Sequence, residues 1–213
     1  MRKIICVNVW ITLFFLVSSC VSDKETNGEN TTEQNKPYWK LICIGDELTA
    51  GIGVAPEDAY PNLTQRTMQQ NGHKIKVVNA AIQGESLKGV NERIHWLMQQ
   101  RFDAILLMFT KKNDGQDELW EELLEKIRLG NPDALIFVAC TFPSYPEGEV
   151  KQCPPTGLLQ QYDVRALDLT IHCSVDCWEE GAGAVYYLGK KGHKQMSEKL
   201  QQIIELNFEK ENH

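Results

Sequence analysis

A nearly continuous apolar run, Ala-Ile-Leu-Leu-Met-Phe at residues 104–109, constrains the fold of this chain most strongly. A strand that is apolar at every position is typical of the centre of a parallel sheet, which helices cover on both faces. We predict this strand at residues 103–109, and further strands at residues 39–44, 74–79, 134–140 and 164–171. Segments with helical spacing separate them. The alternation predicts an α/β protein: a three-layer α/β/α sandwich with a five-stranded parallel sheet and right-handed crossovers.

The segments between the predicted strands carry apolar residues three and four positions apart, which is typical of amphipathic helices. We predict helices at residues 56–72, 86–100, 117–129 and 190–208, and a Pro-rich loop at 143–155. The chain has 213 residues, a length that suits one domain with a sizeable core.

The first 19 residues have the pattern of a bacterial signal peptide. Arg2 and Lys3 precede an apolar run at residues 4–17 that is too short for a comfortable membrane span. The sequence Val-Ser-Ser-Cys at 17–20 then matches a lipobox. We therefore predict cleavage before Cys20, which becomes the lipidated first residue. The alternatives are an ordinary secretory signal with a chance cysteine, or an uncleaved anchor.

A polar tether follows the lipobox, because residues 21–36 contain almost nothing apolar. The chain thus divides into a signal peptide (1–19), a lipidated cysteine with its tether (20–37) and a folded domain (38–213). We expect an exported protein of the cell envelope, held to a membrane by the acyl chains on Cys20. The formal net charge of −7 argues against nucleic acid as a partner. No cofactor and no metal are expected.

Residues 42–51, Ile-Cys-Ile-Gly-Asp-Glu-Leu-Thr-Ala-Gly, lead from the first strand into a polar turn. In open α/β sheets, ligands bind at the carboxyl ends of the strands. This run resembles the Gly-Asp-Ser-Leu-Thr-Ala-Gly block of the SGNH/GDSL hydrolases, in the branch of the small bacterial thioesterases and arylesterases. The resemblance implies a flavodoxin-like strand order of 2-1-3-4-5 and a family activity on esters and thioesters.

The resemblance also indicates that the catalytic triad is degenerate. Glu47 stands where the family has its nucleophilic serine. Gly192-His193 resembles the start of the final helix, and counting back puts Tyr187 at the catalytic histidine and Ala184 at its aspartate. Nucleophile, base and acid act as a unit in these enzymes. We therefore predict a pseudoenzyme, with His193 as a surface or packing residue inside the final helix.

The oxyanion hole, in contrast, is retained according to the resemblance. Gly84 matches the glycine that donates a backbone N–H, and Asn113 matches the oxyanion asparagine. Lys111 and Lys112 replace the two glycines that precede this asparagine in the family. Asp46 matches an aspartate whose role is mainly structural.

Two explanations of Glu47 stay open. In the first, its carboxylate pairs with Lys111 or Lys112 and closes the old oxyanion hole with an internal ion pair. In the second, both lysines point to solvent and Glu47 is only tolerated.

Five cysteines remain after the signal peptide and Cys20 are set aside. Cys43 and Cys140 fall in predicted core strands, so we expect small buried apolar side chains there. Cys153, Cys173 and Cys177 fall in or beside loops of an exported protein, where disulfides persist. We expect one disulfide among these three cysteines, for example Cys153 with Cys173 or Cys177, and a free thiol.

The predicted function is that of an exported lipoprotein whose hydrolase-like domain binds without catalysing. The cleft near Glu47, Gly84, Asn113 and Tyr187 is the expected site, and an acylated sugar or a lipid is the expected ligand, with a protein partner as a second version. The alternative is an active GDSL-type esterase or acylhydrolase with non-standard catalytic residues. Such an enzyme needs a hydroxyl or thiol within hydrogen-bond reach of a histidine in the cleft.

Overall fold

Five parallel strands form the centre of the domain in the computed structural model, which describes residues 38–110, 116–144, 148–151, 153–171, 175–181 and 186–211. Their spatial order is β2-β1-β3-β4-β6, so the expected order and the expected positions of all five strands are confirmed. The strands are β1 (Trp39–Gly45), β2 (Ile75–Asn79), β3 (Ala104–Met108), β4 (Leu135–Ser144) and β6 (Val164–Asp168).

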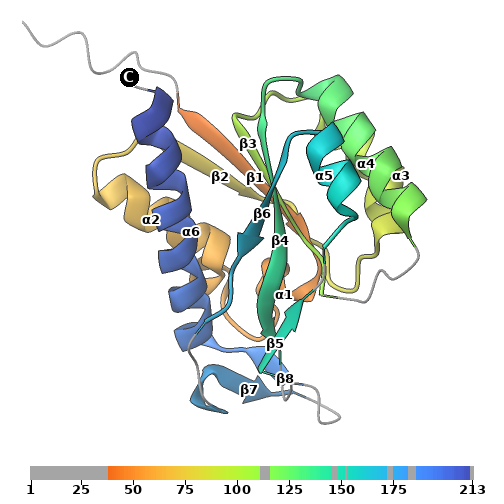
Figure 1. Ribbon diagram of the computed structural model, residues 1–213. Coiled ribbons are helices and arrows are strands. Elements are labelled where there is room, and N and C mark those ends of the chain that lie inside the picture. Colours follow the sequence, from red (N-terminus) through yellow and green to blue (C-terminus); the bar gives the residue numbers. More distant parts are fainter. Residues whose placement is uncertain are drawn as a thin grey trace, which may run out of the picture. The chain divides into compact units, whose positions relative to one another are not determined.

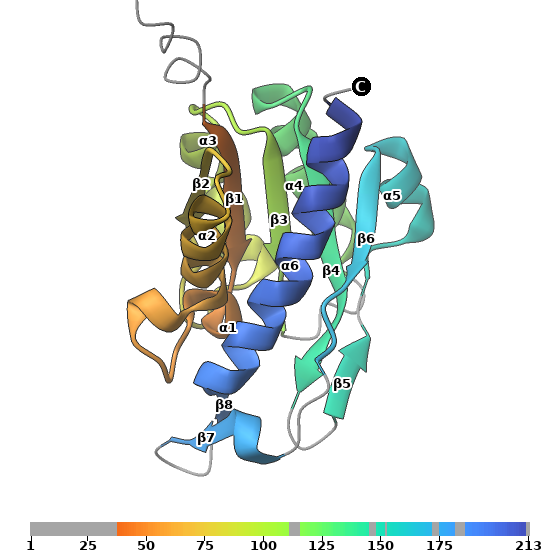
Figure 2. The same cartoon turned by 90° about the vertical axis from the view of Figure 1, so that its left-hand side faces the viewer.

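Helices cover both faces of this sheet (Figure 1). On one face lie α2 (Tyr60–Gln70) and α6 (Lys190–Glu211), which stand in front of the strands in Figure 2. The other face is covered by three helices: α3 (Leu87–Leu97), α4 (Asp117–Gly130) and α5 (Thr156–Gln161). The apolar residues form two core clusters, one on each face. Every side chain of β3 is buried because both faces are covered, which explains its unbroken apolar run.

The four predicted helices correspond to α2, α3, α4 and α6, with a difference at the start of α2, whereas α5 was not predicted. Residues Pro56–Asp58 form a separate 3₁₀ turn, η1, and α2 begins at Tyr60 with Pro61 in its first turn. Proline favours the first turn of a helix, where its missing N–H leaves no bond unmade. Within the described ranges, no helix is both long and apolar enough to cross a membrane.

Two small antiparallel pairs were not expected from the sequence. β5 (Gly148–Lys151) pairs with the end of β4, and β7 (Trp178–Glu180) pairs with β8 (Tyr186–Leu188). All three short strands lie at the end of the sheet where the one-turn helix α1 (Glu47–Ala50) follows β1 (Figure 1). They extend the domain beyond the carboxyl ends of the parallel strands, which is where a ligand site is expected.

The disulfide prediction is wrong in its pairing. Cys140 is not a free core thiol but is bonded to Cys153, because antiparallel pairing of β5 with β4 brings the chain back beside β4, with 4.6 Å between the two Cα atoms. Cys153 therefore pairs with neither Cys173 nor Cys177. Cys177 is disulfide-bonded as well, and Cys173 lies outside the described residues. Cys43 is free and fully buried, as expected.

Candidate functional site

The end of β1 is joined tightly to the end of β3. A Cβ atom on Gly45 would lie 2.2 Å from the carbonyl oxygen of Met108, so only glycine fits there. The next residue, Asp46, is fully buried, and its Oδ2 accepts hydrogen bonds from the N–H (2.5 Å) and the hydroxyl (2.8 Å) of Thr110. Burial raises the pKa of Asp46, and the hydrogen bonds from Thr110 oppose that rise. Asp46 thus holds two strand ends together.

Glu47 opens α1, and its carboxylate accepts a hydrogen bond from the backbone of Gly84. The N–H of Gly84 lies 2.9 Å from Glu47 Oε2. Gly84 has a φ of 75°, a left-handed conformation that favours glycine. According to the family resemblance, this N–H belongs to the oxyanion hole. The hydrogen bond therefore joins the two residues that the resemblance assigns to the nucleophile and to the oxyanion hole.

The loop that carries Gly84 is held by a largely buried ion pair. Arg93 on α3 contacts both carboxylate oxygens of Glu85 at 2.5 Å and donates a further hydrogen bond to the carbonyl of Ala80 at 2.6 Å. Only 5% of the Glu85 side chain is exposed. Two-point contact of this kind fixes geometry as well as charge. The position of the Gly84 N–H thus depends on the ion pair that the next residue, Glu85, forms with Arg93.

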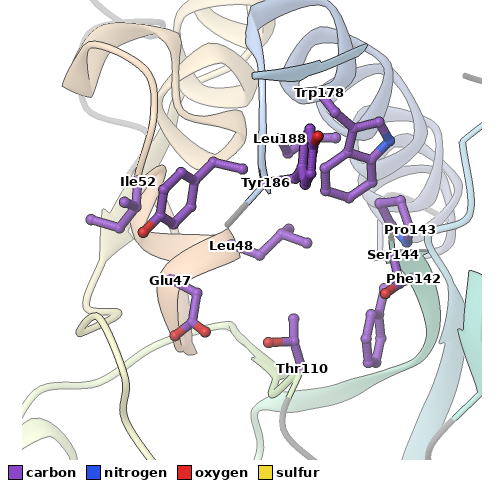
Figure 3. A pocket seen from close by; sticks show the side chains of 11 residues that line it. Glu47, Leu48, Ile52, Thr110, Phe142, Pro143, Ser144, Trp178, Tyr186 and Leu188 are labelled. Carbon is purple, nitrogen blue, oxygen red and sulfur yellow. The ribbon is translucent and has the colours of Figure 1, made fainter. Parts of the chain in front are cut away.

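A pocket of about 130 Å³ opens beside Glu47 (Figure 3). Its walls come from α1, from the end of β3, from the end of β4 and from the β7–β8 pair. The lining residues are Glu47, Leu48, Ile52, Thr110, Phe142, Pro143, Ser144, Trp178, Tyr186, Tyr187 and Leu188. The pocket brings Glu47 and Tyr187 together, two of the residues selected from the sequence.

The remaining selected residues do not all fall in the described part of the chain. Asn113, Lys111, Lys112 and Ala184 lie outside the described residues. The ion pair between Glu47 and one of the two lysines therefore stays a prediction.

Tyr187 packs closely against the backbone of Gly53 at the pocket. A Cβ atom on Gly53 would lie 2.7 Å from the Cβ atom of Tyr187, and Gly53 has a φ of 100°. A larger residue at position 53 would therefore meet both a backbone penalty and a clash with Tyr187.

His193 packs in the interior and does not line the pocket. It lies in the first turn of α6, fully buried, and its Nδ1 accepts a hydrogen bond from the N–H of Tyr60 at 3.3 Å. The two rings stack with their centroids 6.2 Å apart. Burial lowers the pKa of His193 to about 4, so the imidazole is neutral near pH 7. Of the two roles predicted for it, surface or packing, the structure shows packing.

The aromatic side of the pocket was missed from the sequence. Phe142, Trp178 and Tyr186 carry no family motif, and the strands that place them are only three to ten residues long. The one available signal was the concentration of aromatic residues between positions 178 and 187, beside a cysteine.

In the described residues, no cluster of three histidine, cysteine or carboxylate side chains could hold a metal ion.

Comparison with known proteins gives two local sequence matches. The chain is 29% identical to an arylesterase of Vibrio mimicus over 76 residues, which is 36% of this chain and 38% of that protein. It is 28% identical to the esterase TesA of Pseudomonas aeruginosa over 75 residues, which is 35% of this chain and 37% of that protein. The matches thus span well under half of either relative. No protein-family model matches the chain.

Solved structures resemble a much larger part of the domain. The psychrotrophic esterase EstA from Pseudoalteromonas sp. superposes with a TM-score of 0.63 at 17% identity, covering 80% of this chain and 98% of EstA. A family 3 carbohydrate esterase of Clostridium thermocellum gives a TM-score of 0.60 at 19% identity, covering 78% of this chain and 94% of that one. Identities this low establish the fold alone. The shared fold and the local sequence matches to two esterases both support the resemblance to the SGNH/GDSL hydrolases.

Proposed function

We propose that the domain binds a small molecule in the pocket beside Glu47 and does not hydrolyse it. The hydrogen bond from the Gly84 N–H to Glu47 Oε2 carries this proposal. An oxyanion hole accelerates acyl transfer by directing donors at a negative charge that develops only in the transition state. Here the donor already faces a permanent carboxylate, which would also repel a developing oxyanion. The same carboxylate stands in place of the serine hydroxyl.

The other requirement of acyl transfer, a general base beside a nucleophile, also lacks support. Thr110 and Ser144 bring hydroxyls to the pocket, but no histidine is among its described lining residues. A hydroxyl is a poor nucleophile without an adjacent base. The alternative of an esterase with non-standard residues would need a base that reaches one of these hydroxyls. An acylated sugar or a lipid is the ligand class that we propose, by analogy with the superfamily.

Hydrolysis of short-chain p-nitrophenyl esters tests the proposal. We expect no turnover above background by the full chain in neutral detergent, nor by Glu47→Gln, which keeps the shape and adds no nucleophile. The triple change Glu47→Ser, Ala184→Asp and Tyr187→His supplies the three missing groups and is expected to gain turnover over Glu47→Gln. Loss of the nucleophile alone costs a serine hydrolase about a millionfold in kcat. Wild-type turnover that Ser144→Ala or Thr110→Val abolishes would refute the proposal.

We also propose that the chain is exported and anchored to a membrane of the cell envelope through lipidated Cys20. The lipobox at residues 17–20 and the polar segment that follows it support this. Metabolic labelling with a fatty-acid analogue in a bacterial host tests it. Label is expected on the wild type and on Cys6→Ser, and is expected to disappear from Cys20→Ser. Equal labelling of Cys20→Ser and Cys6→Ser would refute the anchor.

A further inference from the structure

The pocket has two chemically different sides. Glu47 lies on one side, next to the hydroxyl of Thr110, and Trp178 and Tyr186 lie together on the opposite side (Figure 3). Phe142 adds a third ring beyond Thr110. A ligand that fills this space must satisfy a carboxylate at one end and cover aromatic rings at the other.

The carboxylate side selects for hydrogen-bond donors. A carboxylate only accepts hydrogen bonds, and Glu47 accepts one from Gly84 through Oε2. No lysine or arginine of the described segments forms an ion pair with Glu47. An ester carbonyl, a carboxylate or a phosphate placed here would set acceptor against acceptor. With glutamate in place of the family's serine, this side of the pocket prefers ligand groups that donate hydrogen bonds over ligand groups that accept them.

The aromatic side favours a cation as well as apolar surface. The faces of Trp, Tyr and Phe rings carry negative charge density and attract ammonium groups, most strongly where water is excluded. Among the described lining residues, Glu47 is charged and none is cationic. The formal net charge of −7 also attracts cations to the protein as a whole.

We infer that the pocket binds ligands with a protonated amine head, held by Glu47, and an apolar or ring-shaped body, held by Trp178, Tyr186 and Phe142. The inference rests on the proposed binding function and narrows it. Among acylated sugars and lipids, it selects those that carry an amine. Neutral hydroxyl heads could also donate to Glu47 but would gain less from the charge and from the rings.

Three probes of nearly equal shape separate the possibilities: 2-phenylethylamine, 2-phenylethanol and 3-phenylpropionate. Their affinities for the full chain in neutral detergent are measured by isothermal titration calorimetry at pH 7. The amine is expected to bind about tenfold more tightly than the alcohol, through the ion pair and cation–π terms. The acid is expected to bind most weakly.

Two variants test whether Glu47 sets the preference, and a third tests the aromatic side. Glu47→Gln keeps the side-chain shape and removes the charge, so the preference for the amine over the alcohol is expected to shrink to the part that the aromatic rings supply. Glu92→Gln changes the net charge by the same amount on the exposed face of α3 and is expected to keep the wild-type preference. Trp178→Leu is expected to weaken both probes, because it removes a ring that both contact.

The inference is overturned if the wild type binds the alcohol as tightly as the amine, prefers the acid, or binds none of the three. An ion pair of Glu47 with Lys111 or Lys112 would produce the first of these results, because the carboxylate would already be occupied. Hydrolysis of p-nitrophenyl esters is measured separately. Turnover there would refute the non-hydrolytic function, whereas the comparison of amine with alcohol would still report on the ligand class.

Discussion

Two regions of this domain hold the side chains that acyl-transfer chemistry uses, and they differ in access. The first is a buried polar cluster where α1, α2 and α6 meet, formed by Thr49, Tyr60, Thr64, His193 and Ser197, each at most 2% exposed. Its hydroxyls form two hydrogen-bonded pairs: Thr49 with Tyr60 at 3.1 Å, and Thr64 with Ser197 at 3.1 Å. The second is the pocket, which has space, hydroxyls and a carboxylate, but no histidine among its described lining residues.

The comparison teaches that residue type does not identify a catalytic site. The buried polar cluster contains a histidine and four hydroxyls, yet no substrate can reach it, and its hydrogen bonds join helices. The pocket is accessible, yet at the position of the family's nucleophile it has the carboxylate of Glu47, which accepts hydrogen bonds from donor groups. Changes in the buried polar cluster should therefore alter stability, whereas changes around the pocket should alter binding more than stability.

The largest expected effect is the loss of stability at acidic pH that results from the buried, neutral state of His193. Its pKa is about 4 in the folded state, against 6.5 for an ordinary histidine, so the unfolded chain takes up a proton first as the pH falls. The contribution of neutral His193 to stability is complete above about pH 6.5 and is lost as the pH falls toward 4. The loss amounts to roughly 3 kcal/mol. Denaturant unfolding at a series of pH values measures it.

His193→Gln separates this effect from the titration of other groups. Glutamine is uncharged over the whole range, so the difference in unfolding free energy between wild type and variant should shrink as the pH falls from 7 to 4. Binding of 2-phenylethylamine at pH 7 should be unchanged in the variant, because His193 does not contact the pocket. Parallel pH profiles for the two proteins would show that His193 does not titrate in this way.

A smaller effect is expected from the ion pair that supports the pocket. Arg93→Ala leaves the Glu85 carboxylate buried without its partner and should lower the unfolding free energy by about 2 kcal/mol. It should also weaken amine binding, since the loop that carries Gly84 loses its anchor. Lys194→Ala, which breaks an exposed pair with Glu198, should change stability by about 0.5 kcal/mol at most. If the Arg93→Ala protein bound the amine as tightly as the wild type does, the anchoring of this loop would not matter for binding in the pocket.

Much of the fold follows from the sequence because its three central parallel strands are largely buried on both faces. The apolar runs of β1, β3 and β4 are long enough to be recognised without tertiary information, and their order follows from the resemblance. β5, β7 and β8 could not be recognised in the same way. They are three or four residues long, and pairing with a neighbouring strand, not an apolar pattern, determines them.

The candidate site was predictable in part for the same reason. The motif around Glu47 and the loop of Gly84 follow consecutive strands, so the sequence indicates that they meet at one edge of the sheet. The direct hydrogen bond between them depends on the side-chain conformation of Glu47, which no motif specifies. The Cys140–Cys153 bond was missed because it depends on the pairing of β5 with β4, which was not predicted. Cys140 also looked like an ordinary member of a core strand.

The smallest expected effect on stability distinguishes two glycines that share a backbone conformation. Gly53 and Gly72 have φ values of 100° and 87°, so alanine at either position should cost about 1 kcal/mol of stability. Only Gly53 faces another residue: its added Cβ would lie 2.7 Å from Tyr187, whereas nothing lies within 4 Å at Gly72. Gly53→Ala should therefore displace Tyr187 and weaken amine binding, and Gly72→Ala should leave binding unchanged. Calorimetric titration of both variants measures this. Equal binding by both would remove Tyr187 from the pocket wall that recognises the ligand, and would leave Trp178, Tyr186 and Phe142 as its aromatic side.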